Sequence, residues 1–175
     1  VMLKSSGRLD EAVACYNQAI ALKPDFADAY VNLGIAIKNL RFNSSNRELY
    51  PLLLQLLTNG NFVRPKDMAC SILSLLKHDP LMRDLLLEKN SSMSLNEATS
   101  IIGSLEKLPL LHRLMRVCPL PDLQFERLFE TMRRFVLTNL DKMEASPELV
   151  YFLSTLSTHC FVNEYVYAES NEEIR

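Results

Sequence analysis

Glycine is scarce in this chain: four glycines stand far apart among 175 residues, and tryptophan is absent. A dinucleotide or phosphate site of the Rossmann or P-loop type needs closely spaced glycines after a strand, so both types are excluded. Strands also need β-branched runs and glycine-rich turns, which are largely absent, whereas leucine is abundant. The composition therefore predicts an all-α protein, and we expect no cofactor.

A strong net charge of either sign is also absent. The chain has 19 Lys and Arg residues against 21 Asp and Glu residues, for a net charge of -2. Nucleic-acid-binding surfaces usually carry a basic stripe, but here basic and acidic residues are interleaved. The strongest basic pair, Arg133 and Arg134, reads as part of a solvated helix face. We therefore expect no nucleic-acid partner.

Long apolar runs are missing as well. The longest run, residues 52–57, is interrupted by Gln55. This is too short to cross a bilayer, and the N-terminus has no signal-peptide pattern. We therefore expect a cytoplasmic chain without a membrane partner.

The four cysteines, Cys15, Cys70, Cys118 and Cys160, form no CxxC pair, and the three histidines lack metal-ligand spacing. No metal site is therefore expected. Each cysteine lies in an apolar helical context. This context predicts buried free thiols, as in a reducing cytosol.

Prolines and capping residues divide the chain into helices. Residues 1–5 read as the end of a helix that is followed by a turn at residues 6–8. Pro24 ends the next helix, because proline disfavours helix at the residue before it. Ser94 and Glu97 form a capping box, in which each side chain satisfies a free amide of the other residue. The expected helices span residues 9–22, 26–40, 46–58, 65–78, 80–88, 94–107, 109–117, 122–141 and 147–167.

Residues 7–40, GRLDEAVACYNQAIALKPDFADAYVNLGIAIKNL, place small and large apolar residues in a fixed order. This order resembles the tetratricopeptide repeat (TPR), a helix–turn–helix unit of about 34 residues. The period decays after residue 40. The resemblance implies TPR-like repeats over residues 1–58, the first truncated and the last degenerate. An irregular α-helical array or bundle over residues 59–175 would cover one end of them as a spacer or docking domain. Because Val1 begins inside a repeat, we expect a piece of a longer protein.

One stripe of the expected helix 26–40 is not used by the repeat pattern. The phrase ADAYVNLG within it resembles the repeats of O-GlcNAc transferase and its bacterial relatives. In that family, an Asn at the place of Asn32 lines a concave groove and holds peptide backbone. An amide suits this task because it donates and accepts hydrogen bonds. The resemblance implies a groove for a protein or peptide. The stripe and the nearby end of the helix at residues 1–5 predict its lining: Lys4, Asp28, Asn32, Ile35, Lys38 and Asn39. The alternative is an exposed Asn beside a helix that fills the groove.

The C-terminal phrase FLSTLSTHCFVNEYVYAESNEE, with CPLPDLQFERLFETMRR before it, carries a second resemblance. It is similar to a helical region of bacterial proteins in which TPRs precede a class I S-adenosylmethionine-dependent methyltransferase domain. The resemblance implies a chain that presents a partner to a downstream methyltransferase. Asn163, Glu164 and Tyr165 are the candidate domain contacts, against the alternative of a polar notch in a core.

No residue pattern indicates catalysis. Lys77-His78-Asp79 precedes Pro80, where a charged helix cap is the simpler interpretation. His112 and His159 lie in apolar helical sequence and are expected in the core or at its boundary. We therefore predict a non-catalytic protein–protein interaction module. The alternatives are a structural docking or dimerisation unit, with a homodimer through residues 1–40, and the TPR part of an O-GlcNAc-transferase-like glycosyltransferase.

Overall fold

The computed structural model describes residues 2–38, 40–59, 62–87 and 93–163, with side chains from Glu11 onward except Asn17. Within these ranges the chain is helical and contains no strand, which confirms the all-α prediction. None of the described helices is long and apolar enough to cross a membrane. The helices are α1 (Met2–Leu22), α2 (Ala27–Lys38), η1 (Arg47–Leu49), α3 (Tyr50–Thr58), α4 (Pro65–Leu76), α5 (Pro80–Leu87), α6 (Leu95–Glu106), α7 (Pro109–Val117), α8 (Leu123–Asn139), η2 (Leu140–Lys142) and α9 (Pro147–Val162).

The first helix differs from the prediction. α1 runs without a break from Met2 to Leu22, so the turn expected at residues 6–8 is wrong. A glycine inside a helix costs only about 1 kcal/mol relative to alanine, and this 21-residue helix accommodates Gly7. The break at Pro24 is correct, because α1 ends at Leu22 and α2 begins at Ala27.

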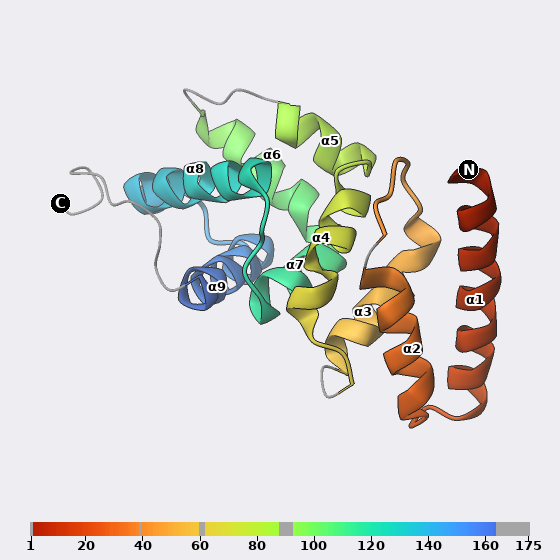
Figure 1. Cartoon of the computed structure of the whole chain (residues 1–175). Helices are drawn as coiled ribbons and strands as arrows, with labels where there is room; N and C mark the ends of the chain where they lie inside the picture. The colour runs from red at the N-terminus through yellow and green to blue at the C-terminus, as the bar shows by residue number, and fades with distance from the viewer. Residues whose placement is uncertain (1, 39, 60–61, 88–92, 164–175) are drawn as a thin grey trace.

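α1 and α2 form a helical hairpin at one end of the molecule (Figure 1). The inner side of α2 is fully buried, and its Tyr30 hydroxyl donates to the Pro24 carbonyl at 3.1 Å. The Tyr30 ring stacks on Phe62 with ring centroids 5.3 Å apart. The hairpin is therefore fastened to the chain that precedes α4.

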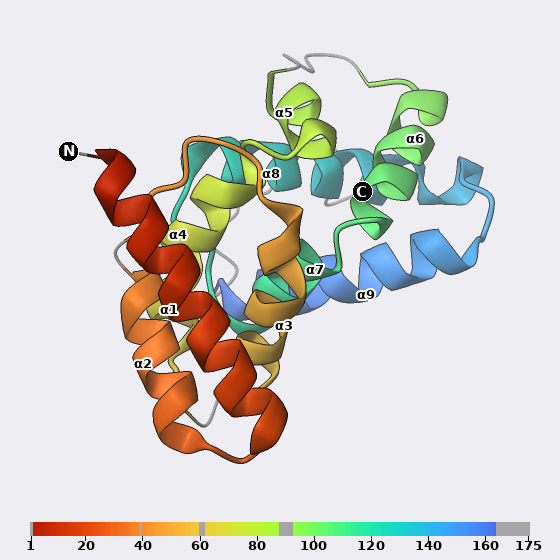
Figure 2. The ribbon, with the colours of Figure 1, turned by 90° about the vertical axis from the view of Figure 1, so that its right-hand side faces the viewer.

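The helix α7 lies at the centre of the remaining helices (Figure 2). It packs against α3, α4, α6 and α9, and most of its nine residues are buried. Arg113 reaches from α7 to the end of α3, where its guanidinium donates twice to the Leu57 carbonyl, at 3.1 and 3.3 Å. One apolar core therefore continues from the TPR-like hairpin into the later helices.

Side-chain caps define several of the later helix starts. The capping box of Ser94 and Glu97 is present as predicted, with the Ser94 amide donating to Glu97 Oε2 at 2.7 Å. Asp122 caps α8, and Ser146 caps α9, by accepting from backbone amides of the first turn. These local signals explain why the predicted starts of α6, α8 and α9 lie within one residue of those observed.

Candidate functional site

α2 presents one exposed stripe opposite its buried side. Asp28, Val31, Asn32, Ile35 and Lys38 recur every three or four residues along it, and all are exposed. Ile35 exposes 62% of its surface, although it is a large apolar residue in a well-packed helix. The stripe therefore combines an amide, charges and an apolar anchor on one accessible surface.

α4 lies beside α2 and extends this surface. Lys38 Nζ lies 3.5 Å from Asp67 Oδ2, and both side chains remain partly exposed. Below this ion pair, the Ser71 hydroxyl donates to the Lys38 carbonyl at 3.0 Å and fixes the two helices together. We call the combined surface the α2–α4 face, which consists of Asp28, Val31, Asn32, Ile35, Lys38, Asp67, Cys70, Ser74 and Lys77.

A hollow of about 260 Å³ lies at one end of the α2–α4 face. The Phe42 amide donates to Ser74 Oγ at 3.0 Å, which holds the segment after α2 against α4. On the other side, Lys77 pairs with Asp122 at the start of α8. The hollow is lined by Arg41, Cys70, Leu73, Ser74, Lys77, Pro121 and Asp122.

The sequence prediction missed this hollow. Its walls come from three segments that are distant in sequence, and only the fold brings them together. One signal was available: Asp67, Cys70, Ser74 and Lys77 recur at helical spacing as a small or polar stripe within an apolar helix.

The other predicted site residues divide into two groups. Lys4 belongs to α1, but its side chain lies outside the described residues, as does Asn39. Asn163 caps the end of α9, where its backbone N–H donates to the His159 carbonyl at 2.9 Å. Glu164 and Tyr165 lie outside the described residues, so the proposed domain contact stays a prediction.

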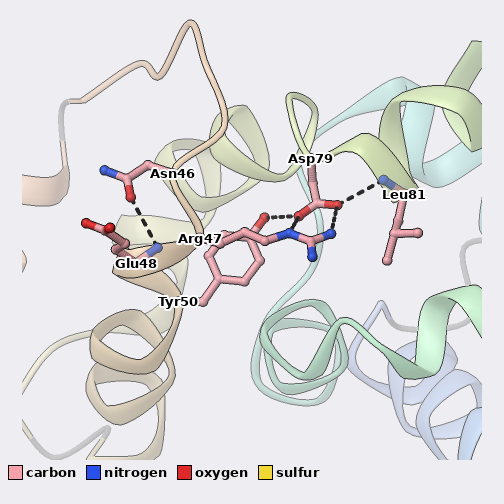
Figure 3. Close-up of polar contacts among 6 residues, drawn as sticks. All are labelled: Asn46, Arg47, Glu48, Tyr50, Asp79 and Leu81. Carbon is pink, nitrogen blue, oxygen red and sulfur yellow. Dashed lines mark hydrogen bonds and ion pairs between the residues drawn. The ribbon is translucent and has the colours of Figure 1, made fainter.

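Asp79, which the sequence predicts to cap a helix, does cap the start of α5 and also joins other helices to it. The side chain is fully buried and accepts the Leu81 amide at 3.0 Å, at the start of α5. Arg47 donates to both of its carboxylate oxygens at 2.8 Å, and the Tyr50 hydroxyl donates at 2.7 Å (Figure 3). These donors join η1 and α3 to the turn between α4 and α5. The arrangement satisfies the buried carboxylate and is typical of structural support.

The charges of this cluster favour an ionised Asp79. Burial raises the pKa of the Asp79 carboxyl, but hydrogen bonds from Arg47, Tyr50 and the Leu81 amide outweigh burial and leave it below the usual range. Burial, followed by the hydrogen bond to Asp79, raises the pKa of Tyr50. A group available for acid–base work near neutral pH would need the opposite shifts.

His112 and His159 lie in the core, as predicted. His112 Nδ1 lies 3.1 Å from the Thr155 hydroxyl, and His159 Nδ1 lies 3.2 Å from the Met115 carbonyl, so each joins α7 to α9. Burial lowers the pKa of His112 to about 4, with the nearby Arg116 charge in support and the Leu105 carbonyl opposed. Burial also lowers the pKa of His159. Both imidazoles are therefore neutral at physiological pH.

The prediction of four buried thiols is wrong in part. All four cysteines are free, but only Cys118 is buried, and Cys15 is exposed on α1. Val13 is the buried neighbour of Cys15, whereas Ala14 is exposed like Cys15, so an apolar sequence context does not place a helical residue on the buried side. Among the described residues, no group of three or more potential metal ligands comes together.

Comparison with known proteins gives one family. Residues 2–40 match the family model described as TPR repeat. The chain therefore carries a TPR repeat, formed by α1 and α2, and TPRs generally indicate a protein–protein interaction module. The comparisons with curated proteins and with solved structures returned no match.

Proposed function

We propose that this chain is a non-catalytic protein-binding module whose α2–α4 face holds an extended segment of a partner protein. The observation that carries the proposal is the exposed stripe of α2, where Asn32 and Ile35 lie one turn apart on the accessible side of a TPR helix. The binding surface would run from this stripe across α4 toward the hollow beside Arg41.

The side chains of the stripe suit an extended peptide. The Asn32 amide would donate to one backbone group and accept from the next, which orients the segment without selecting its side chains. Ile35 would bury apolar surface of the partner, a contribution of roughly 25 cal/mol per Å². Lys38 and Asp67 form a partly exposed pair that adds little stability of its own, so either partner can exchange for a ligand group at small cost.

The wider role rests on the C-terminal resemblance. We infer that the module belongs to a larger bacterial protein and presents its partner to a downstream S-adenosylmethionine-dependent methyltransferase, the fragment itself being no enzyme. A glycosyltransferase of the O-GlcNAc transferase type is the alternative, supported by the phrase ADAYVNLG. In the full-length protein, a strand followed by a glycine-rich turn would support the methyltransferase, and a nucleotide-sugar domain would support the glycosyltransferase.

A structural docking or dimerisation unit is the second candidate function. The side of α1 away from α2 exposes Ala14, Cys15, Gln18 and Leu22 at helical spacing, with Leu22 89% exposed. A second copy could cover this side. Light scattering at increasing concentration would give twice the monomer mass if it does, and a strict monomer would remove this candidate.

The binding proposal is tested with a displayed library of twelve-residue peptides selected on the 175-residue chain. Asn32→Ala should weaken the affinity for the best selected peptide at least tenfold. Asn96→Ala is the matched control, because Asn96 is an exposed helical asparagine on α6, outside the α2–α4 face. Unchanged binding by Asn32→Ala would remove Asn32 from the site.

A further inference from the structure

A second hollow, of about 470 Å³, lies between α6 and the start of α9. These two helices belong to the part of the molecule away from α1 (Figure 1). The exposed side of α6 forms one wall, and the segment from Met143 to Leu149 forms the other. Ile102, Met143 and Leu149 give it an apolar floor, while its rim is polar. We call it the α6–α9 groove. It shares no lining residue with the α2–α4 face.

Gly103 lies within the groove wall and inside α6. A Cβ atom added there would meet no atom within 4 Å, so packing does not require glycine at this position. Glycine also weakens a helix interior relative to alanine. By contrast, a Cβ at Gly34 would lie 2.7 Å from the Val63 side chain, which explains that glycine by packing. The bare backbone at Gly103 leaves open the space that a side chain would fill in the groove.

The rim of the groove is acidic. Glu106, Glu144 and Glu148 line it, against one basic residue, Lys107. In the described part of the chain, neither Glu106 nor Glu144 takes part in an ion pair. Glu148 lies in the first turn of α9, where it offsets the positive end of that helix. Lys107 is the C-cap of α6, so it places a basic group at the negative end of that helix.

We propose that the α6–α9 groove binds a short segment of another protein that carries an arginine or lysine side chain. The basic group would lie between Glu106 and Glu144, and the segment's backbone would pass over Gly103. The apolar floor favours a peptide over a free metal cation or polyamine, because it would bury the aliphatic part of a long basic side chain. A volume of this size is within the range of about 300–1,000 Å³ that is typical of ligand pockets.

The test uses a displayed library of nine-residue peptides, selected in parallel on the 175-residue chain and on its Gly103→Gln variant. Gln is a good helix former and its side chain would project into the groove. The Gly103→Gln variant should therefore keep its fold while the groove is filled. We expect a class of peptides with one invariant Arg or Lys to be enriched on the natural chain only. The thermal unfolding midpoint of Gly103→Gln should equal or exceed that of the natural chain.

Charge variants then test the chemistry. Glu106→Gln and Glu144→Gln should each weaken the affinity for the enriched peptide at least fivefold. Added salt should also weaken binding of this peptide to the natural chain. Glu11→Gln, on α1, is the matched control and should change nothing, as should Asn32→Ala, which separates this groove from the α2–α4 face. If Gly103→Gln unfolds, Gly103→Ala combined with Glu106→Gln replaces it. Equal enrichment on both chains, or enriched peptides without a basic residue, would overturn the proposal.

Discussion

Arg47 and Asp79, which stand 32 residues apart, form a two-point ion pair in which the Asp79 side chain is fully buried and the Arg47 side chain is 55% exposed. The pair fastens the segment that leads into α3 to the turn where α4 ends and α5 begins (Figure 3). Tyr50 adds a third donor from α3. The position of the α2–α4 face depends on this junction, because α4 forms half of it.

Removal of Arg47 tests this support. Arg47→Met leaves a buried carboxylate with only Tyr50 and the Leu81 amide as donors, and loss of one partner of a buried pair is strongly destabilising. Because Arg47 is half exposed, we expect the free energy of unfolding to fall by about 2–3 kcal/mol, below the range for a fully buried pair. Urea unfolding at pH 7 measures it. Arg83→Met, which removes an exposed pair with Asp84, should cost less than about 1 kcal/mol.

Acid should weaken the same junction at low pH. The pKa of Asp79 is lower in the folded chain than its unfolded value of about 3.9. Its contribution to stability is therefore complete above the unfolded pKa and is lost as the pH falls through the folded pKa. Asp79→Asn should reduce the loss of stability below about pH 4. Parallel curves for the two chains in that range would contradict the assignment.

The two buried histidines should lower the stability of the chain at a higher pH than Asp79 does. An unfolded histidine has a pKa near 6.5, whereas folded His112 has one of about 4, so the unfolded chain binds the proton first. Stability should fall as the pH drops from about 6.5 to 4, by roughly 3 kcal/mol for His112. His112→Leu should flatten this part of the stability curve, measured by urea unfolding at pH 7, 6 and 5.

Two glycines in helices should respond oppositely to alanine. Gly34→Ala places a methyl group 2.7 Å from both Val63 Cγ atoms, and the stiff valine side chain cannot easily turn away. We expect a loss of about 1–2 kcal/mol, typical of overpacking. Gly103→Ala meets open space and should gain about 0.5–1 kcal/mol from helix propensity. Thermal and urea unfolding measure both, and Val63→Ala should rescue Gly34→Ala in the double variant.

The cysteines should react in a defined order. Cys15 is exposed, whereas Cys118 is buried, and burial raises the pKa of its thiol to about 11. A maleimide at pH 7 should therefore modify Cys15 first and Cys118 last. Peptide mapping by mass spectrometry after a short reaction identifies the modified sites, and denaturant should make all four reactive. Early modification of Cys118 in the folded chain would contradict the packing of α7.

The sequence predicted the features that depend on neighbouring residues. Pro24 ends the first helix because its ring acts on the residue before it, and Ser94 reaches Glu97 within one helical turn. The buried and exposed sides of α2 follow from helical spacing alone.

Features that depend on distant residues were beyond the sequence. Gly7 and its neighbours suggested a turn, but α1 continues through them. The partner of Asp79 is Arg47, and nothing near either residue in sequence indicates the pair. The hollow beside Arg41 and the groove at Gly103 likewise need segments that only the packing of the helices brings together.

Binding of a partner segment to the α2–α4 face is tested by an NMR titration. The ¹⁵N-labelled 175-residue chain is titrated with the best peptide from the twelve-residue library. The shifts of the backbone amides are then mapped onto the helices. Binding at this face should give the largest amide shifts in α2 and α4, around Asn32, Ile35 and Cys70, with little change in α8. Shifts confined to other helices, or the same shifts in Asn32→Ala with unchanged affinity, would contradict it.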